Sequence, residues 1–137
     1  MTETDGVPLS VEGLLLPRRL VLLLSGGRWT APDDAVLRRV FPEPADFPSF
    51  YGAASIVGVN RGWHSESRAA YVCRPDPANP PGDIDPARSL LIGELGPDQM
   101  FALDYRRPGS PAVVYLAEPG WVEVAPDFDA FADRLGL

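Results

Sequence analysis

Two side chains in the chain are candidates for a nucleophile or a general base, His64 and Cys73, and each is the only residue of its type. A Ser–His–Asp or Cys–His arrangement would have to include His64, and the segment Trp63-His64-Ser65-Glu66 offers a general base in principle. No zinc-ligating residues cluster around it in the sequence, which argues against a zinc site. We expect His64 to be exposed and without a catalytic role, as is usual for a lone histidine in a Gly-, Ser- and Arg-rich stretch. Cys73 follows the apolar stretch 69–72, so we expect a small buried hydrophobic residue rather than a reactive thiol.

Two aspartates and two glycine pairs are further candidates, for acid–base catalysis and for phosphate binding. Asp98 and Asp104 could pair as acid and base, but their spacing favours one turn aspartate and one strand aspartate, with Asp104 bonded to backbone or to an arginine. Neither Gly26–Gly27 nor the pair Gly93 and Gly96 is followed by Gly-Lys-Ser/Thr, so we interpret them as turn and cap glycines rather than phosphate loops. We therefore expect no catalytic residue, no metal site and no cofactor.

Length and charge narrow the classes of partner. The chain has 137 residues, and we expect them to form one domain, with 1–8 flexible. The net charge of −7 argues against nucleic acid and anionic membranes as partners. The apolar stretch Leu14–Leu24 is interrupted by charged residues and is too short to span a membrane, and Glu3, Asp5 and Glu12 are acidic where a signal peptide would be basic. We expect a cytoplasmic protein.

The elements that must position these residues begin with a helix over Pro17–Leu24. Proline suits the first helical position, and Gly26–Gly27 ends the apolar stripe. The preceding segment Val11–Leu16 fits either an extra helical turn or a strand. A second helix over Asp33–Val40 is expected to be capped by Thr30.

The middle of the chain gives weaker signals. A short helix is predicted around Ser49–Val57, although Gly52 and the β-branched residues at 56–57 oppose it. Residues 74–88 contain five prolines, and we expect an extended loop there.

The C-terminal half predicts an antiparallel meander followed by a helix. Over Met100–Arg106 the side chains alternate between two faces, as in a strand, with Phe101 and Leu103 on one face and Ala102 on the other. After the last predicted strand, the spacing of apolar residues changes to that of an amphipathic helix, which we expect to pack on the sheet. The other predicted strands are Leu90–Gly93, Ala112–Leu116 and Trp121–Val124, and the apolar stripe of the closing helix is Phe128, Phe131, Ala132 and Leu135. Helices, then a meander, then a closing helix predict the α+β class.

The stretch Leu91-Ile-Gly-Glu-Leu-Gly-Pro-Asp-Gln-Met-Phe-Ala-Leu-Asp-Tyr-Arg106 resembles the central signature of the SUKH superfamily, the Smi/Knr-like domains. The strands Val114-Tyr-Leu and Trp121-Val-Glu-Val and the helix 127–135 resemble the family's ending, and Leu16-Pro17 through Gly26-Gly27 resembles its opening helix. The positions that carry this resemblance are Pro17, Gly26, Gly27, Gly93, Leu103, Asp104, Trp121, Phe128, Phe131 and Leu135.

This resemblance implies an α+β domain with N-terminal helices, a twisted, mostly antiparallel meander sheet and a C-terminal helix packed on it. It also implies a non-enzymatic protein-binding function without a cofactor, since bacterial members are commonly immunity proteins that neutralise toxins, often nucleases. Together with the acidic charge, it predicts a basic toxin domain as the partner. A regulatory adaptor without a toxin partner is the alternative hypothesis, and a small enzyme is a third.

A binding face is predicted from acidic and aromatic residues. The aromatic side chains serve equally well as anchors for a partner or as core; they are Trp29, Trp63, Trp121, Tyr51, Tyr71, Tyr105 and Tyr115. The residues predicted to contact a protein partner are Trp63, Glu66, Asp83, Asp85, Glu94 and Asp98.

Overall fold

The computed structural model describes residues 6–66 and 69–137, and within them the chain has the predicted α+β fold. The α-helices are α1 (Arg18–Ser25), α2 (Asp34–Val40), α3 (Ala53–Ser65), α4 (Ala69–Val72) and α5 (Phe128–Leu135), with a 3-10 helix η1 at Pro86–Arg88. The strands are β1 (Ser10–Val11), β2 (Leu14–Leu15), β3 (Ser49–Phe50), β4 (Pro81–Gly82), β5 (Ser89–Glu94), β6 (Met100–Asp104), β7 (Ala112–Leu116) and β8 (Trp121–Ala125).

The main sheet is an antiparallel meander with one short strand added at each edge. Its order is β3-β5-β6-β7-β8-β4, so the four consecutive strands predicted in the C-terminal half lie side by side. Ser49–Phe50 forms β3 against the end of β5, which corrects the prediction of a helix there. The Pro-rich segment contributes Pro81–Gly82 as β4 at the opposite edge, so 74–88 is not a loop throughout.

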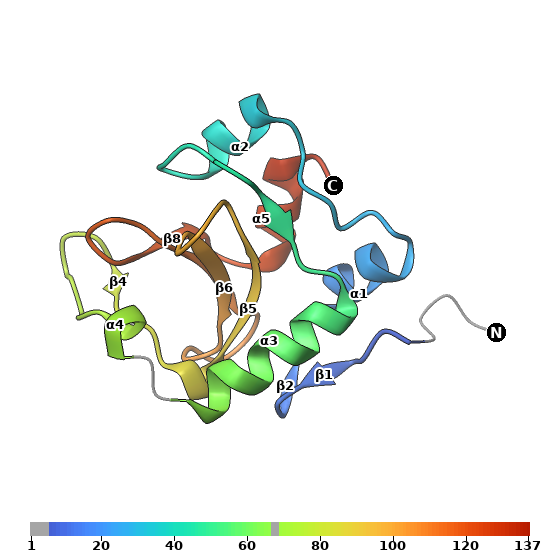
Figure 1. The fold of residues 1–137 in the computed structure, drawn as a ribbon, viewed down its shortest axis with the longest axis horizontal. Helices are drawn as coiled ribbons and strands as arrows, with labels where there is room; N and C mark the ends of the chain where they lie inside the picture. Colours follow the sequence, from blue (N-terminus) through green and yellow to red (C-terminus); the bar gives the residue numbers. More distant parts are fainter. Residues whose placement is uncertain (1–5, 67–68) are drawn as a thin grey trace.

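The two faces of the sheet pack against different elements (Figure 1). Phe101 and Leu103 point into the larger core, where α1, α2 and α5 cover the sheet. Ala102 points to the other face and packs with Trp63 and Trp121. The alternation predicted for β6 is therefore confirmed, and so is the stripe on α5, whose apolar residues are all buried.

The N-terminal helices end where expected but are capped differently. α1 follows Pro17 and ends at Gly26, with Gly27 in the left-handed region at φ 67°. The cap of α2 is Asp33, whose carboxylate accepts from the backbone N–H of Val36 at 3.1 Å, so the prediction of Thr30 as the cap is wrong. The aspartate lies directly before the helix and satisfies one of its free N–H groups. The segment 11–16, for which the sequence allows either a helical turn or a strand, takes part in the short β1–β2 hairpin.

Helix α3 starts later and runs further than predicted. Gly52 is its N-cap, and the helix lies along the outer edge of β5. The buried amide of Asn60 donates to the carbonyl of Leu91 at 2.9 Å and accepts from the N–H of Leu91 at 2.8 Å. The side chain thus replaces the neighbouring strand that β5 lacks at this point.

Among the described residues, no helix combines the length and the apolar character that crossing a membrane requires.

Candidate protein-binding surface

The carboxylates predicted to contact a partner lie at opposite ends of the sheet. In the β5–β6 pair, Ser89 is opposite Asp104 at one end and Glu94 is opposite Met100 at the other. Asp83 lies at the Asp104 end, because Arg106 donates to both carboxylates. Asp98 lies at the other end, in the turn that follows Glu94. The six predicted contact residues therefore do not form one face. Asp98 lies in the turn before β6, and Asp104 lies at the far end of that strand, where it bonds to Arg106. The predicted assignment of one turn aspartate and one strand aspartate is therefore confirmed.

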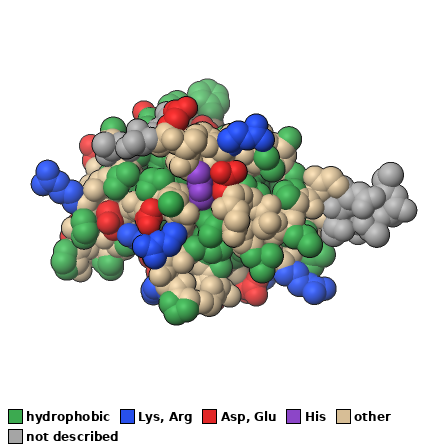
Figure 2. Space-filling view, turned by 90° about the horizontal axis from the view of Figure 1, so that it is seen from below, with side chains coloured by type: hydrophobic (Ala, Val, Ile, Leu, Met, Phe, Trp, Pro, Cys, Tyr) green, Lys and Arg blue, Asp and Glu red, His purple; other side chains and the backbone are tan. Residues whose placement is uncertain are grey.

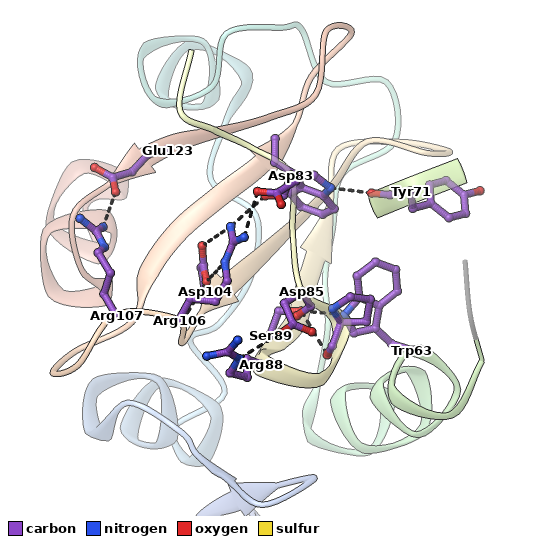
Figure 3. Close-up of polar contacts among 12 residues, drawn as sticks. Trp63, Tyr71, Asp83, Asp85, Arg88, Ser89, Asp104, Arg106, Arg107 and Glu123 are labelled. Atoms are coloured by element: carbon purple, nitrogen blue, oxygen red, sulfur yellow. Dashed lines mark hydrogen bonds and ion pairs between the residues drawn. The ribbon is translucent and has the colours of Figure 1, made fainter. Parts of the chain in front are cut away.

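The end that carries Asp83 is neutralised by arginines (Figure 3). The guanidinium of Arg106 contacts the carboxylates of Asp83 at 2.9 Å and of Asp104 at 3.0 Å. Asp85 caps η1 and contacts Arg88 at 2.9 Å. The hydrogen bonds with Asp104, followed by those with Asp83, raise the pKa of Arg106 against the opposing effect of burial. We interpret this cluster as a structural clasp between β6 and the segment after β4.

At the other end, three carboxylates are bonded to tyrosine hydroxyls. Each phenol donates to its own carboxylate, over distances of 2.5 to 2.7 Å: Tyr51 to Glu94, Tyr71 to Asp98 and Tyr115 to Glu43. A neutral hydroxyl satisfies a carboxylate oxygen without cancelling its negative charge. This end of the sheet differs in that respect from the arginine-paired end.

Burial is the largest cause that raises the pKa of both Tyr51 and Tyr115 above the ordinary value, and the bonded glutamates Glu94 and Glu43 add to it. The two phenols therefore remain protonated donors at neutral pH. They hold their carboxylates in fixed positions at the end of the sheet.

Of the bonded pairs, Glu43, Tyr71 and Asp98 border a depression of about 560 Å³, which we call the acidic hollow. Glu43, Asp98 and Glu118 line it, and no arginine occurs among its described lining residues. Its position is fixed because the N–H of Glu118 donates to Glu43 at 2.9 Å and Gln99 donates to the Tyr115 hydroxyl at 3.1 Å. Tyr71, Pro97 and Leu116 supply an aromatic and apolar part of the wall. Carboxylates beside such surface suit an arginine or lysine side chain of a partner.

The remaining predicted residues have mostly structural roles. Trp63 is 3% exposed and donates its indole N–H to the Ser89 hydroxyl at 2.8 Å, so most of its side chain belongs to the core. Glu66 is exposed just beyond the end of α3.

His64 is half-buried rather than exposed, which corrects the prediction. Its Nε2 lies 2.8 Å from the carbonyl oxygen of Ser89 and must donate to it. The histidine ring is visible at the surface, between hydrophobic side chains and an acidic one (Figure 2). The same face carries both acidic and arginine side chains. Cys73 is partly buried, and burial raises the pKa of its thiol, with a further contribution from Asp83. Cys73 also lines the acidic hollow, so the prediction of a buried residue is met only in part.

The positions that carry the family resemblance lie in caps, turns and core. Pro17, Gly26 and Gly27 bound α1, and Asp104 belongs to the Arg106 clasp. Gly93 lies within β5, which corrects its interpretation as a turn or cap glycine, and it lies beneath the ring of Phe101, where a Cβ would overlap it. The other positions are buried: Leu103, Trp121, Phe128, Phe131 and Leu135.

Glu43, Glu118 and Asn60 are not among the functional residues predicted from the sequence. The two glutamates sit in Pro-containing turns far apart in the chain, and nothing local indicates that the turns meet. Asn60 had a detectable signal, because it lies between Ile56 and Trp63 at helical spacing, where a polar residue interrupts the buried face.

In the described part of the chain, no three or more His, Cys, Asp or Glu side chains are grouped so that they could hold a metal ion. No protein-family model, curated protein or solved structure matches the chain.

Proposed function

We propose that this chain is a SUKH-type domain that works by binding a protein, as an immunity protein that neutralises a bacterial toxin. The order of elements supports the family proposal: N-terminal helices, an antiparallel meander and a C-terminal helix docked on it. This is the arrangement that the resemblance implies. The resemblance also covers the glycines that end α1, Gly93 within β5 and the buried stripe of α5, which are positions on which the fold depends.

The acidic hollow is the observation that carries the choice of a basic partner. Among the described residues, the carboxylates of Glu43 and Asp98 accept from hydroxyl and backbone N–H groups and form no ion pair with an arginine, so their charge is available to a partner. The net charge of −7 adds a long-range attraction for a positively charged surface. A toxin domain that binds nucleic acid is basic where it contacts phosphates, and a nuclease therefore has suitable surface chemistry.

Co-expression with the product of the adjacent gene tests the proposal. We expect that protein to be toxic alone, to be tolerated in the presence of this chain, and to co-purify with it. We also expect the association rate to fall as salt rises from 50 to 500 mM, because exposed charges are screened beyond roughly 10 Å at 0.1 M salt.

Failure of both growth rescue and co-purification would contradict the immunity proposal. Recovery of a non-toxic regulatory protein instead would favour the adaptor hypothesis.

A further inference from the structure

An apolar groove lies beside the acidic hollow, between α3, α4 and the strands β5 and β6. It encloses about 360 Å³, and the residues that shape it include Gly58, Gly62, Trp63, Tyr71, Leu91 and Met100. The groove exists because two glycines, one helical turn apart, face it from α3. A Cβ built on either glycine meets no atom within 4 Å. Side chains at these positions would occupy the space that the glycines leave open.

The groove and the acidic hollow form one surface. Tyr71 lines both, and its hydroxyl donates to Asp98 in the hollow at 2.5 Å. At the other side of the groove, Met100 is directly opposite Glu94 in the β5–β6 pair. Side chains in such a pair are about 5 Å apart at Cβ, so Glu94 lies at the groove's rim. Carboxylates therefore border the apolar groove on two sides, Asp98 toward the hollow and Glu94 beside Met100.

We propose that this combined surface is the docking site for a basic segment of the protein partner, with an apolar side chain in the groove and an arginine or lysine in the acidic hollow. The inference rests on the proposed binding function and specifies its surface. Charge complementarity selects the occupant, because an acidic segment would be repelled by Glu94, Asp98 and Glu118.

Filling the groove is the first test. Gly62→Leu places a side chain in the groove, whereas Gly62→Ala adds one methyl group and is the matched control; Gly58→Leu and Gly58→Ala repeat the pair one turn away. All four substitutions remove a glycine from the interior of α3 and are compatible with its helical backbone. Thermal unfolding measured by circular dichroism selects the folded variants.

Reversing charge in the hollow is the second test. Glu118→Arg is compared with Glu12→Arg, which makes the same change in net charge in the β1–β2 turn, outside both the groove and the hollow. A local effect of Glu118 is thereby separated from the general field of the protein.

The probes are three fluorescein-labelled 15-residue helical peptides, measured by fluorescence anisotropy with the full chain. One carries leucine and arginine on one face, one replaces arginine by glutamate, and one replaces leucine by serine. We expect only the Leu/Arg peptide to bind. Gly62→Leu, Gly58→Leu and Glu118→Arg should each weaken binding about tenfold, alanine at position 62 or 58 should weaken it less than leucine at the same position, and Glu12→Arg should stay within about twofold.

Equal binding of the Leu/Arg and Leu/Glu peptides, or equal affinity of the leucine variants and the wild type, would overturn the proposal. The toxin co-expression assay separates this result from the proposed function. Toxin neutralisation that survives Gly62→Leu and Glu118→Arg would overturn the surface but leave the immunity function standing. Peptide binding with the expected variant pattern, but no neutralised toxin, would support the surface and contradict the immunity function.

Discussion

Arg106 and Asp83 are joined by an ion pair of 2.9 Å, reinforced by a second bond from the guanidinium to the backbone carbonyl of Asp83 at 2.9 Å. The pair connects the end of β6 with the segment that follows the edge strand β4. Both side chains are about one-quarter exposed, at 23% and 25%. The interaction is therefore less screened by solvent than an ordinary surface ion pair.

Replacing Arg106 by glutamine should lower the free energy of unfolding by about 2 kcal/mol, because Asp83 and Asp104 would lose a charged partner while remaining partly buried. Urea denaturation at pH 7 measures the change. Arg107→Gln is the control, since Arg107 and Glu123 are 69% and 38% exposed, and its effect should be below about 0.5 kcal/mol. Equal losses for the two variants would contradict the clasp.

Glycine to alanine substitutions at positions 93 and 58 should have opposite effects. A Cβ at Gly93 would overlap the Phe101 ring and lie 3.0 Å from the carbonyl oxygen of Ser49, and Phe101 is held among other aromatic rings. We expect Gly93→Ala to destabilise the protein by about 2 kcal/mol. Gly58→Ala adds a methyl group in open space within α3 and should stabilise by roughly 0.5–1 kcal/mol. Thermal and urea unfolding measure both changes. A change of stability in the same direction for the two variants would contradict the prediction.

The sequence predicted those elements whose signals are local. The alternation predicted over Met100–Arg106 is confirmed as far as Asp104, where β6 ends, and the stripe from Phe128 to Leu135 is confirmed; both patterns repeat within a few residues. The edge strands β3 and β4 are two residues each, too short to show a period, and they exist because of partners distant in the chain. Their formation depends on tertiary contacts rather than on local preference.

The candidate surface was less predictable for a related reason. Acidic residues near one another in sequence, such as Asp85 and Glu94, are separated by the length of β5. Glu43 and Glu118 are far apart in sequence and meet only because the β7–β8 turn lies against the segment after α2. Composition correctly predicts an acidic protein. It does not predict that Asp83 and Asp85 are neutralised by arginines, because that pairing is visible only in the folded structure.

Asn60 is expected to be the most sensitive polar position in α3. Its side chain is fully buried and serves both the N–H and the carbonyl of Leu91, and it also donates to the carbonyl of Ile56 at 2.8 Å. Asn60→Ala would leave the Leu91 groups unpaired in the interior and should cost about 3 kcal/mol. Urea denaturation measures this loss, and amide hydrogen exchange should show faster exchange at Leu91. Ser65→Ala, at the exposed end of the same helix, should change neither. An unchanged Leu91 exchange rate in Asn60→Ala would show that the amide does not protect this edge.

Stability should decline in alkaline solution because of the buried phenols. Burial raises the pKa of Tyr51, Tyr105 and Tyr115 above the ordinary value of about 10. Above about pH 10 the unfolded chain therefore releases these protons first, and the free energy of unfolding falls as pH rises. Tyr115, which is fully buried, should contribute a slope of about 1.4 kcal/mol per pH unit while it is ionised only in the unfolded chain.

Urea denaturation at pH 8, 9, 10 and 11 tests this dependence, together with absorbance at 295 nm, which follows phenolate formation. The folded protein should form little phenolate from these three tyrosines near pH 10, whereas the urea-unfolded chain should titrate there. In Tyr115→Phe the alkaline slope should become shallower, even though the variant is less stable at pH 8 because Glu43 loses its hydroxyl donor. A slope unaltered by this substitution would mean that Tyr115 ionises equally in both states and is not protected by the core.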